Sequence, residues 1–349
     1  MGVRKLNKFL TDKGLTQEYS DLEHYIEHIR SDPDKNNNRI DDDKIVIAID
    51  FWLYVHKFLH SSKSTNIALA FLNQIIRFLT LGIIPIYVAD GCVPIEKEEE
   101  YNNRNESRNR KLDDLQMLYS DYDENITEID RLERHVKRAS RDDMREILNI
   151  FDLMNIKLVR ARYEADALCT LMYREQMITA CLSDDMDMLA LGCGKTIRIE
   201  RGKIIEYDLE RILRELKLTH EQFVDLCIIF GSGYLKHPVR IDGETAYDVI
   251  RKSGSLLDAM FSCDHPEFNV ETRNINVIGE NYHNAFDVYM ESPNREKIEF
   301  EVDVPRFNNY DVINYLRGAE WYISSSKNIR HMKYDLYCIS KIISNEKLE

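Results

Sequence analysis

The chain has 349 residues, of which 44% are hydrophobic, and a formal net charge of −14. It is long enough for one large domain or two smaller ones, and its acidity argues against a non-specific nucleic-acid coat or an anionic membrane surface. Seven cysteines without a C-x-x-C pair argue against a zinc site and suit a reducing compartment. Because we find no signal peptide and no apolar run of roughly 18 residues, we expect a soluble, intracellular protein in the nucleus or cytoplasm.

The first hundred residues predict two buried strands that each end in an acid. Residues 45–50 (IVIAID) and 83–89 (IIPIYVA) are apolar runs typical of central parallel strands, with a helical pattern over 65–81 between them. Asp50 ends the first run and Asp90 follows the second. A right-handed βαβ unit would bring both acids to the ligand-binding edge of an α/β sheet. The alternative is that Asp50 only caps the helix that follows it.

Residues 95–147 are rich in charge and contain neither glycine nor proline, which indicates long, solvated helices inserted into the core fold. Most of these charges fit an exposed helical face. Lys97 and Arg104 differ, because they closely follow Asp90 and are therefore expected near the same edge.

Two further apolar runs, at 156–159 and 178–182, are each followed by a close pair of acids. The pairs are Glu164 with Asp166 and Asp185 with Asp187. The first pair falls in the first turn of a predicted helix, where the helix dipole alone would favour an acid. Residues 196–207 predict a hairpin, 208–230 two helices, and 308–345 a mainly helical segment.

Six acids are thus expected at one edge of one sheet. Without counter-charge they would repel one another and take up protons, whereas Mg²⁺ or Mn²⁺ would bind them because hard cations prefer oxygen ligands. Two such ions can clamp a phosphodiester, activating water on one side and steadying the leaving oxygen on the other. Lys97 and Arg104 would bring positive charge to the phosphate. A P-loop nucleotide site is not supported, because the G-x-x-x-x-G-K-[ST] pattern is missing from the sequence.

The order and spacing of several motifs make the chain resemble the flap endonuclease (XPG-type) family of structure-specific 5′ nucleases. These motifs read MGVRKLNKFL, VIAID, GIIPIYVADG, YEADALC, SDDMDML and FVDLCIIFGSGY. The resemblance implies an α/β, PIN-like fold with a central, mostly parallel sheet flanked by helices. It also implies a catalytic domain at 1–255, with an N-terminal part at 1–94, a helical arch at 95–147 and an internal part at 148–255. A mainly helical extension follows at 256–349.

The resemblance also implies roles for particular residues. The first metal group would be Asp50, Asp90, Glu164 and Asp166, and the second would contain Asp185 and Asp187. Lys97 and Arg104 match the family's catalytic basic pair, and Gly2 and Lys8 match N-terminal positions near the DNA. The expected activity is Mg²⁺-dependent cleavage, by a monomer, near the junction of a 5′ flap and duplex DNA, in replication, repair or recombination.

Three departures from the family pattern bear on activity. Gly233 stands where the family's G-S-D-Y motif has a seventh acid, so water, Asp225 or Asp242 would have to compensate, or activity is reduced. The family's G-I-G-P-K motif reads RIDGE at residues 240–244, which weakens the expected grip on duplex DNA because added acids oppose phosphate binding. Residues 330–349 lack a basic run and the glutamine-aromatic box that binds the sliding clamp.

Two alternatives to an active DNA nuclease follow. One is a degenerate homologue that binds or scaffolds DNA junctions and has weak or no nuclease activity. The other is an RNA-directed nuclease of the wider PIN-like group, which shares the acids. The composition, rich in Asn, Ile and Tyr, would also suit a large DNA virus, in which case the protein would act in the host cell.

Overall fold

The computed structural model describes residues 3, 5–31, 44–60, 66–119, 122–231, 241–262, 275–318, 336, 337 and 339. The chain divides into two compact units, and each is described by itself. The first comprises Met1–Asp50, Val88–Glu96 and Val159–Glu301, and the second comprises Phe51–Tyr87, Lys97–Leu158 and Val302–Glu349.

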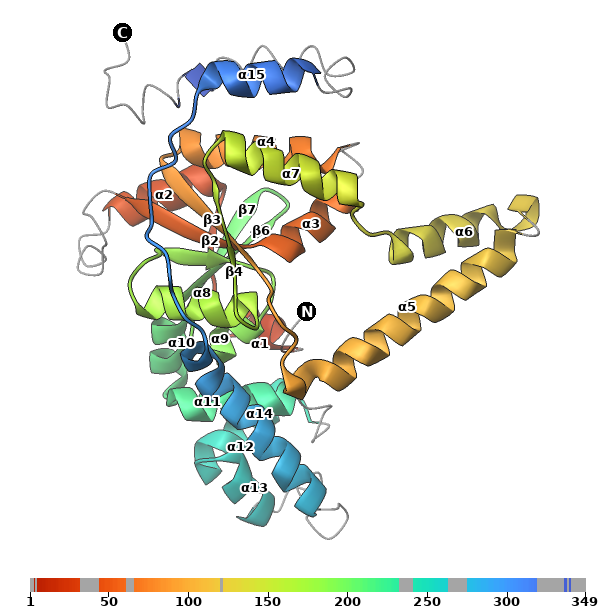
Figure 1. Cartoon of the computed structure of the whole chain (residues 1–349). Helices are drawn as coiled ribbons and strands as arrows, with labels where there is room; N and C mark the ends of the chain where they lie inside the picture. The colour runs from red at the N-terminus through yellow and green to blue at the C-terminus, as the bar shows by residue number, and fades with distance from the viewer. Residues whose placement is uncertain are drawn as a thin grey trace. The chain divides into compact units, whose positions relative to one another are not determined.

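The strands form a seven-stranded mixed sheet in the order β1-β7-β6-β5-β2-β3-β4. Strands β2, β3, β4, β6 and β7 are labelled in Figure 1. Strand β2 pairs in parallel with β5, and β5 in parallel with β6, whereas β7 is antiparallel to both β6 and β1. The strands are β1 (Gln17–Tyr19), β2 (Ile45–Asp50), β3 (Ile83–Ala89), β4 (Lys157–Arg160), β5 (Ala180–Leu182), β6 (Lys195–Glu200) and β7 (Lys203–Asp208).

The helices of the first unit follow sequence signals that can be read locally. In α11 the capping box of Thr219 and Gln222 starts the helix, and Gly231, with φ of +94°, ends it because glycine enters that region without a Cβ penalty. These helices are α1 (Leu6–Asp12), α2 (Leu22–Ser31), α8 (Ala165–Arg174), α9 (Asp187–Ala190), α10 (Leu209–Leu216), α11 (His220–Phe230), α12 (Gly243–Ser253), α13 (Leu256–Ser262) and α14 (Ile275–Arg295).

The second unit contains α3 (Phe51–Leu59), α4 (Ile67–Thr80), α5 (Glu98–Leu118), α6 (Tyr122–Val136), α7 (Arg141–Leu153) and α15 (Asn309–Gly318). The three-residue 3₁₀ turn Ile95–Lys97 precedes α5. Helices α5 and α6 form a hairpin (Figure 1) with a small core of its own, made by Leu115, Ile129, Leu132 and Val136. Little else on α5 is buried, as the charge-rich sequence predicted.

The first unit's main core joins α1 to α9–α14 through buried residues such as Leu6, Phe223, Tyr247 and Tyr289. Strands β2 and β3 are apolar along almost their whole length because they lie inside the sheet. The predicted α/β fold, with a sheet flanked by helices, is confirmed. The sheet is mixed because two features add antiparallel pairs. One is the β6–β7 hairpin, which the sequence predicted at residues 196–207, and the other is the short β1, which sequence patterns did not indicate.

Candidate metal centre

All six predicted metal ligands lie in the first unit, at the ends of regular elements. Asp50 is the last residue of β2, and Asp90 directly follows β3. Glu164 is the N-cap of α8 and Asp166 lies in its first turn. Asp185 lies in the loop after β5, and Asp187 is the first residue of α9.

Asp90 is tied to the helix that carries Glu164 and Asp166. The backbone N–H of Ala165 donates to Asp90 Oδ1 at 2.8 Å. The N–H of Gly91 donates to the Tyr163 carbonyl at 2.7 Å. A Cβ on Gly91 would lie only 2.1 Å from the Ala161 carbonyl oxygen, so this close approach of two loops requires glycine.

The buried thiol of Cys169 on α8 is influenced by the charges of both Asp50 and Asp90. A hydrogen bond with Cys181 lowers the pKa of Cys169, but burial and the negative charges of Cys193, Asp50 and Asp90 outweigh it, so the pKa lies above its ordinary value. Both carboxylates are therefore within electrostatic reach of one side chain.

The second pair is organised by the turn that follows β5. Parallel pairing of Ile49 with Leu182 sets Asp50 beside the start of this turn. Ser183 Oγ accepts from the N–H of Asp185 at 3.1 Å, and Asp185 Oδ1 accepts from the N–H of Asp187 at 2.9 Å. Asp187 itself is buried, with 4% of its surface exposed.

Two residues that hold these acids were missed by sequence reasoning. The Tyr289 hydroxyl donates to Asp187 Oδ1 at 2.9 Å. Glu296 accepts from the backbone N–H groups of Arg162 and Tyr163, at 2.7 and 2.8 Å, immediately before Glu164. No local motif marks either residue, because each is more than 100 positions from the acid or loop that it contacts.

The donor set fits Mg²⁺ or Mn²⁺ in its chemistry, since it consists of carboxylate oxygens on tethered backbone segments. Within the described residues, no three acidic, histidine or cysteine side chains lie close enough together to hold one ion. The structure shows backbone links between segments that carry predicted ligands. Joint coordination of an ion by these six acids stays a prediction.

The two acids suggested as substitutes at the Gly233 position are already engaged elsewhere. Asp225 accepts from the Tyr282 hydroxyl and, at 2.9 Å, from the N–H of Leu256, and burial raises its pKa to about 6. Asp242 caps α12 by accepting from the N–H groups of Glu244 and Thr245. Gly233 itself lies outside the described residues, so water filling the vacant ligand position stays a prediction.

The predicted basic residues occupy exposed or half-buried positions. Lys97 is the N-cap of α5, and Arg104 pairs with Glu100 one turn earlier; such an exposed pair is worth only about 0.5 kcal/mol, so a phosphate can displace it. Lys8 is exposed on α1, whereas Gly2 and most of 330–349 lie outside the described residues.

The α1 helix contacts the segment that replaces the family's G-I-G-P-K motif. Lys13 pairs with Glu244 at 2.5 Å, and Lys5 donates to the Ile241 carbonyl at 3.3 Å. Lys13, the C-cap residue of α1, therefore offsets the charge of one of the added acids. Because both side chains are partly exposed, this pair, like that of Arg104 with Glu100, can be displaced by a DNA phosphate.

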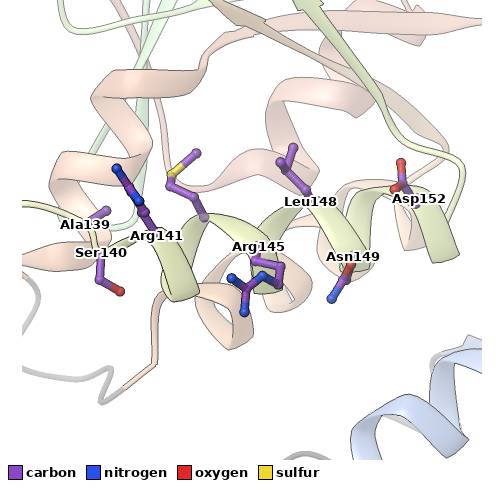
Figure 2. Close-up of a pocket in the computed structure, with 8 residues that line it drawn as sticks. Ala139, Ser140, Arg141, Arg145, Leu148, Asn149 and Asp152 are labelled. Atoms are coloured by element: carbon purple, nitrogen blue, oxygen red, sulfur yellow. The ribbon is translucent and has the colours of Figure 1, made fainter.

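A pocket along α7, in the second unit, contains none of the six acids (Figure 2). Its lining includes Arg141, Arg145, Leu148 and Asp152, all on one helix. This pocket therefore shares no residue with the candidate metal centre.

The fold is that of XPG-type nuclease cores. The catalytic core of Rad2 in complex with DNA substrate aligns with a TM-score of 0.64 and 18% identity, over 96% of this chain and 100% of that one. Residues 1–111 match the XPG N-terminal domain, and residues 155–233 match the XPG I-region. The chain belongs to the XPG family of flap-endonuclease type.

Curated relatives are similar over part of their length. Flap endonuclease 1-A of Sorghum bicolor is 31% identical over 230 residues, which is 60% of this chain and 60% of that protein. Flap endonuclease 1-B of Oryza sativa subsp. indica is 27% identical over 244 residues, 64% of this chain and 59% of that protein. The chain thus spans about three-fifths of the length of these relatives. None of the helices that the structure describes has the length and apolarity required to cross a bilayer.

Proposed function

We propose that this protein is a structure-specific 5′ nuclease that hydrolyses DNA phosphodiester bonds near a 5′-flap junction and requires divalent metal ions. The observation that carries the proposal is the tether from the N–H of Ala165 to Asp90 Oδ1. It joins the acid after β3 to the helix that bears Glu164 and Asp166. Membership in the XPG family supports the same activity.

The six acids would bind two metal ions, one in each of two groups. Asp50, Asp90, Glu164 and Asp166 would bind the first, while Asp185 and Asp187 would share the second with water at the Gly233 position. Mg²⁺, or Mn²⁺ in its place, would supply Lewis acidity toward the phosphate and a water of lowered pKa. Without such ions, carboxylates gathered at one centre would repel one another.

Four further residues, chosen by their match to the family motifs, would bind and orient the DNA. Lys97 and Arg104 would contact the scissile phosphate, because Arg104 can exchange its exposed pair with Glu100 for a bidentate pair with phosphate oxygens. Lys8 and Gly2 would contact DNA from the N-terminal segment. The α5–α6 hairpin would form the arch for the single-stranded 5′ end.

One set of observations bears on the strength of the second metal group. Asp225 and Asp242 are committed to hydrogen bonds that hold α13 and α12, so neither is available as the acid missing at Gly233. A second group with one ligand fewer would bind its ion more weakly, and cleavage would then need a higher metal concentration.

The test is a substrate panel with purified protein and Mg²⁺, Mn²⁺ or EDTA. The panel holds labelled 5′-flap, nicked, gapped and single-stranded DNA, and an RNA version of the flap. We expect cleavage near the DNA flap junction that EDTA abolishes. Inactivity of the wild type on every substrate, relieved by Gly233→Asp, would establish the degenerate alternative, and preference for the RNA flap would establish the RNA nuclease.

A further inference from the structure

Helix α14 lies outside both family regions, which cover residues 1–111 and 155–233. Within the first unit it runs beside α11 and α8 (Figure 1). From its middle to its C-terminal end, α14 and the residue after it make three polar contacts with segments that carry the predicted metal ligands or lead into them.

The first contact is the hydrogen bond from the Tyr289 hydroxyl to Asp187 Oδ1, at 2.9 Å. Tyr289 is fully buried and Asp187 nearly so. A charge-assisted bond in such surroundings is stronger than an ordinary one, and it fixes the rotation of the carboxylate. The orientation of the Asp187 side chain therefore depends on a residue 102 positions further along the chain.

The second contact is made by Glu296, whose side chain is buried with 4% of its surface exposed. One carboxylate oxygen accepts from the N–H of Arg162 and the other from the N–H of Tyr163. The same loop contacts the turn after Asp90 through the bond from Gly91 to Tyr163. Glu296 therefore holds the loop that leads into Glu164 and that contacts the turn after Asp90.

The third contact is an ion pair between Arg295 and Glu96, with 2.7 Å between Nη1 and Oε1. Glu96 lies six residues after Asp90, on the segment that leads to Lys97. The C-terminal end of α14 thus contacts two segments: the one that follows Asp90 and the loop that precedes Glu164.

We infer that α14 is a positioning element for both acid groups. Tyr289 orients Asp187 for the second ion, and Glu296 holds the loop that sets Asp90 against Glu164 for the first. Neither is a catalytic residue, because each acts through another group. The inference rests on the proposed function, since it assigns α14 a role at that same centre. Partners that orient metal ligands typically change metal affinity by about 10–100-fold when they are removed.

The chain provides a matched control on the same helix. Tyr282 also donates its hydroxyl to a buried aspartate, Asp225, but that aspartate holds α13 and is not among the six predicted ligands. Tyr289→Phe and Tyr282→Phe therefore delete the same atom from two similar bonds. A purely structural role predicts that both variants lose stability and neither changes metal affinity.

The experiment measures the melting temperature of full-length wild type, Tyr289→Phe and Tyr282→Phe during titration with Mn²⁺, and single-turnover cleavage of a 5′-flap duplex across the same range. We expect Tyr289→Phe to raise the Mn²⁺ concentration at half-maximal stabilisation by about tenfold. Tyr282→Phe is expected to lower the melting temperature in the absence of metal and to leave that midpoint unchanged.

The outcomes separate this inference from the proposed function. Equal midpoints in wild type and Tyr289→Phe, or the same shift in both variants, overturn the inference even when the wild type cleaves DNA. A shift confined to Tyr289→Phe supports it even when no substrate is cleaved, in which case only the proposed function fails. If Tyr289→Phe does not fold, Glu296→Gln replaces it; an unchanged midpoint there overturns the inference, and a raised one supports it.

Discussion

Gly91→Ala should disturb the candidate metal centre without altering any acid. The new Cβ would lie 2.1 Å from the carbonyl oxygen of Ala161 and 2.5 Å from that of Arg162. Both are backbone atoms of the loop that leads to Glu164, so a side-chain rotation cannot relieve the overlap. The loop must move away from the turn after Asp90.

This movement breaks two hydrogen bonds, from Gly91 to Tyr163 at 2.7 Å and from Cys92 to Arg162 at 3.0 Å. Each is worth about 1 kcal/mol, and overpacking adds about 1–3 kcal/mol. We therefore expect the free energy of unfolding to fall by about 3–5 kcal/mol. Asp90 and Glu164 would separate, so cleavage should fall much more than stability at temperatures where the variant remains folded.

Urea denaturation monitored by circular dichroism gives the stability, and flap cleavage under conditions where the variant is folded gives the activity. Gly318→Ala is the control, because nothing lies within 4 Å of a Cβ at that helical position; it should match the wild type. An unfolding free energy of Gly91→Ala within about 0.5 kcal/mol of the wild type, with normal cleavage, would refute the steric argument.

Three other changes test neighbouring parts of the account. Burial raises the pKa of Asp225 to about 6. The stabilisation that comes from protonated Asp225 is therefore present below about pH 4 and is lost as the pH rises to about 6, a change on the order of 3 kcal/mol in the free energy of unfolding. Asp225→Asn should flatten this part of the stability–pH curve, and an unchanged slope would contradict the assignment. Asp187→Asn should abolish cleavage with little loss of stability, because the amide oxygen can still accept from Tyr289; a collapse of the melting temperature would argue for a structural role instead. Gly233→Asp should lower the Mg²⁺ concentration needed for half-maximal cleavage, and an unchanged requirement would show that no ligand is missing there.

Local sequence patterns identified those elements whose signal lies within one short segment of the chain. The apolar runs of β2 and β3 gave strands ending next to Asp50 and Asp90, because a strand buried on both faces has few polar positions. Strand β1 has only three residues, and its pairing with β7 depends on a distant partner, so no pattern within it could reveal it.

The candidate site shows the same division. Acid types and their spacing indicated the six predicted ligands, since such residues at strand ends have a recognisable chemistry. Tyr289 and Glu296 could not be found in this way, because their roles arise from tertiary packing of α14. The steric demand at Gly91 likewise depends on the carbonyl of Ala161, which lies 70 positions further along the chain.

The most direct test of the account compares single-turnover cleavage of a 5′-flap duplex in Mg²⁺ by the wild type, Asp90→Asn and Asp185→Asn. Each variant removes one carboxylate from one of the two groups, and Glu175→Gln, at an exposed position after α8, is the charge-matched control. We predict that both aspartate variants remain folded and cleave at least about 100-fold more slowly, while Glu175→Gln cleaves normally. Wild-type rates in both aspartate variants would contradict the assignment of these acids to a metal centre.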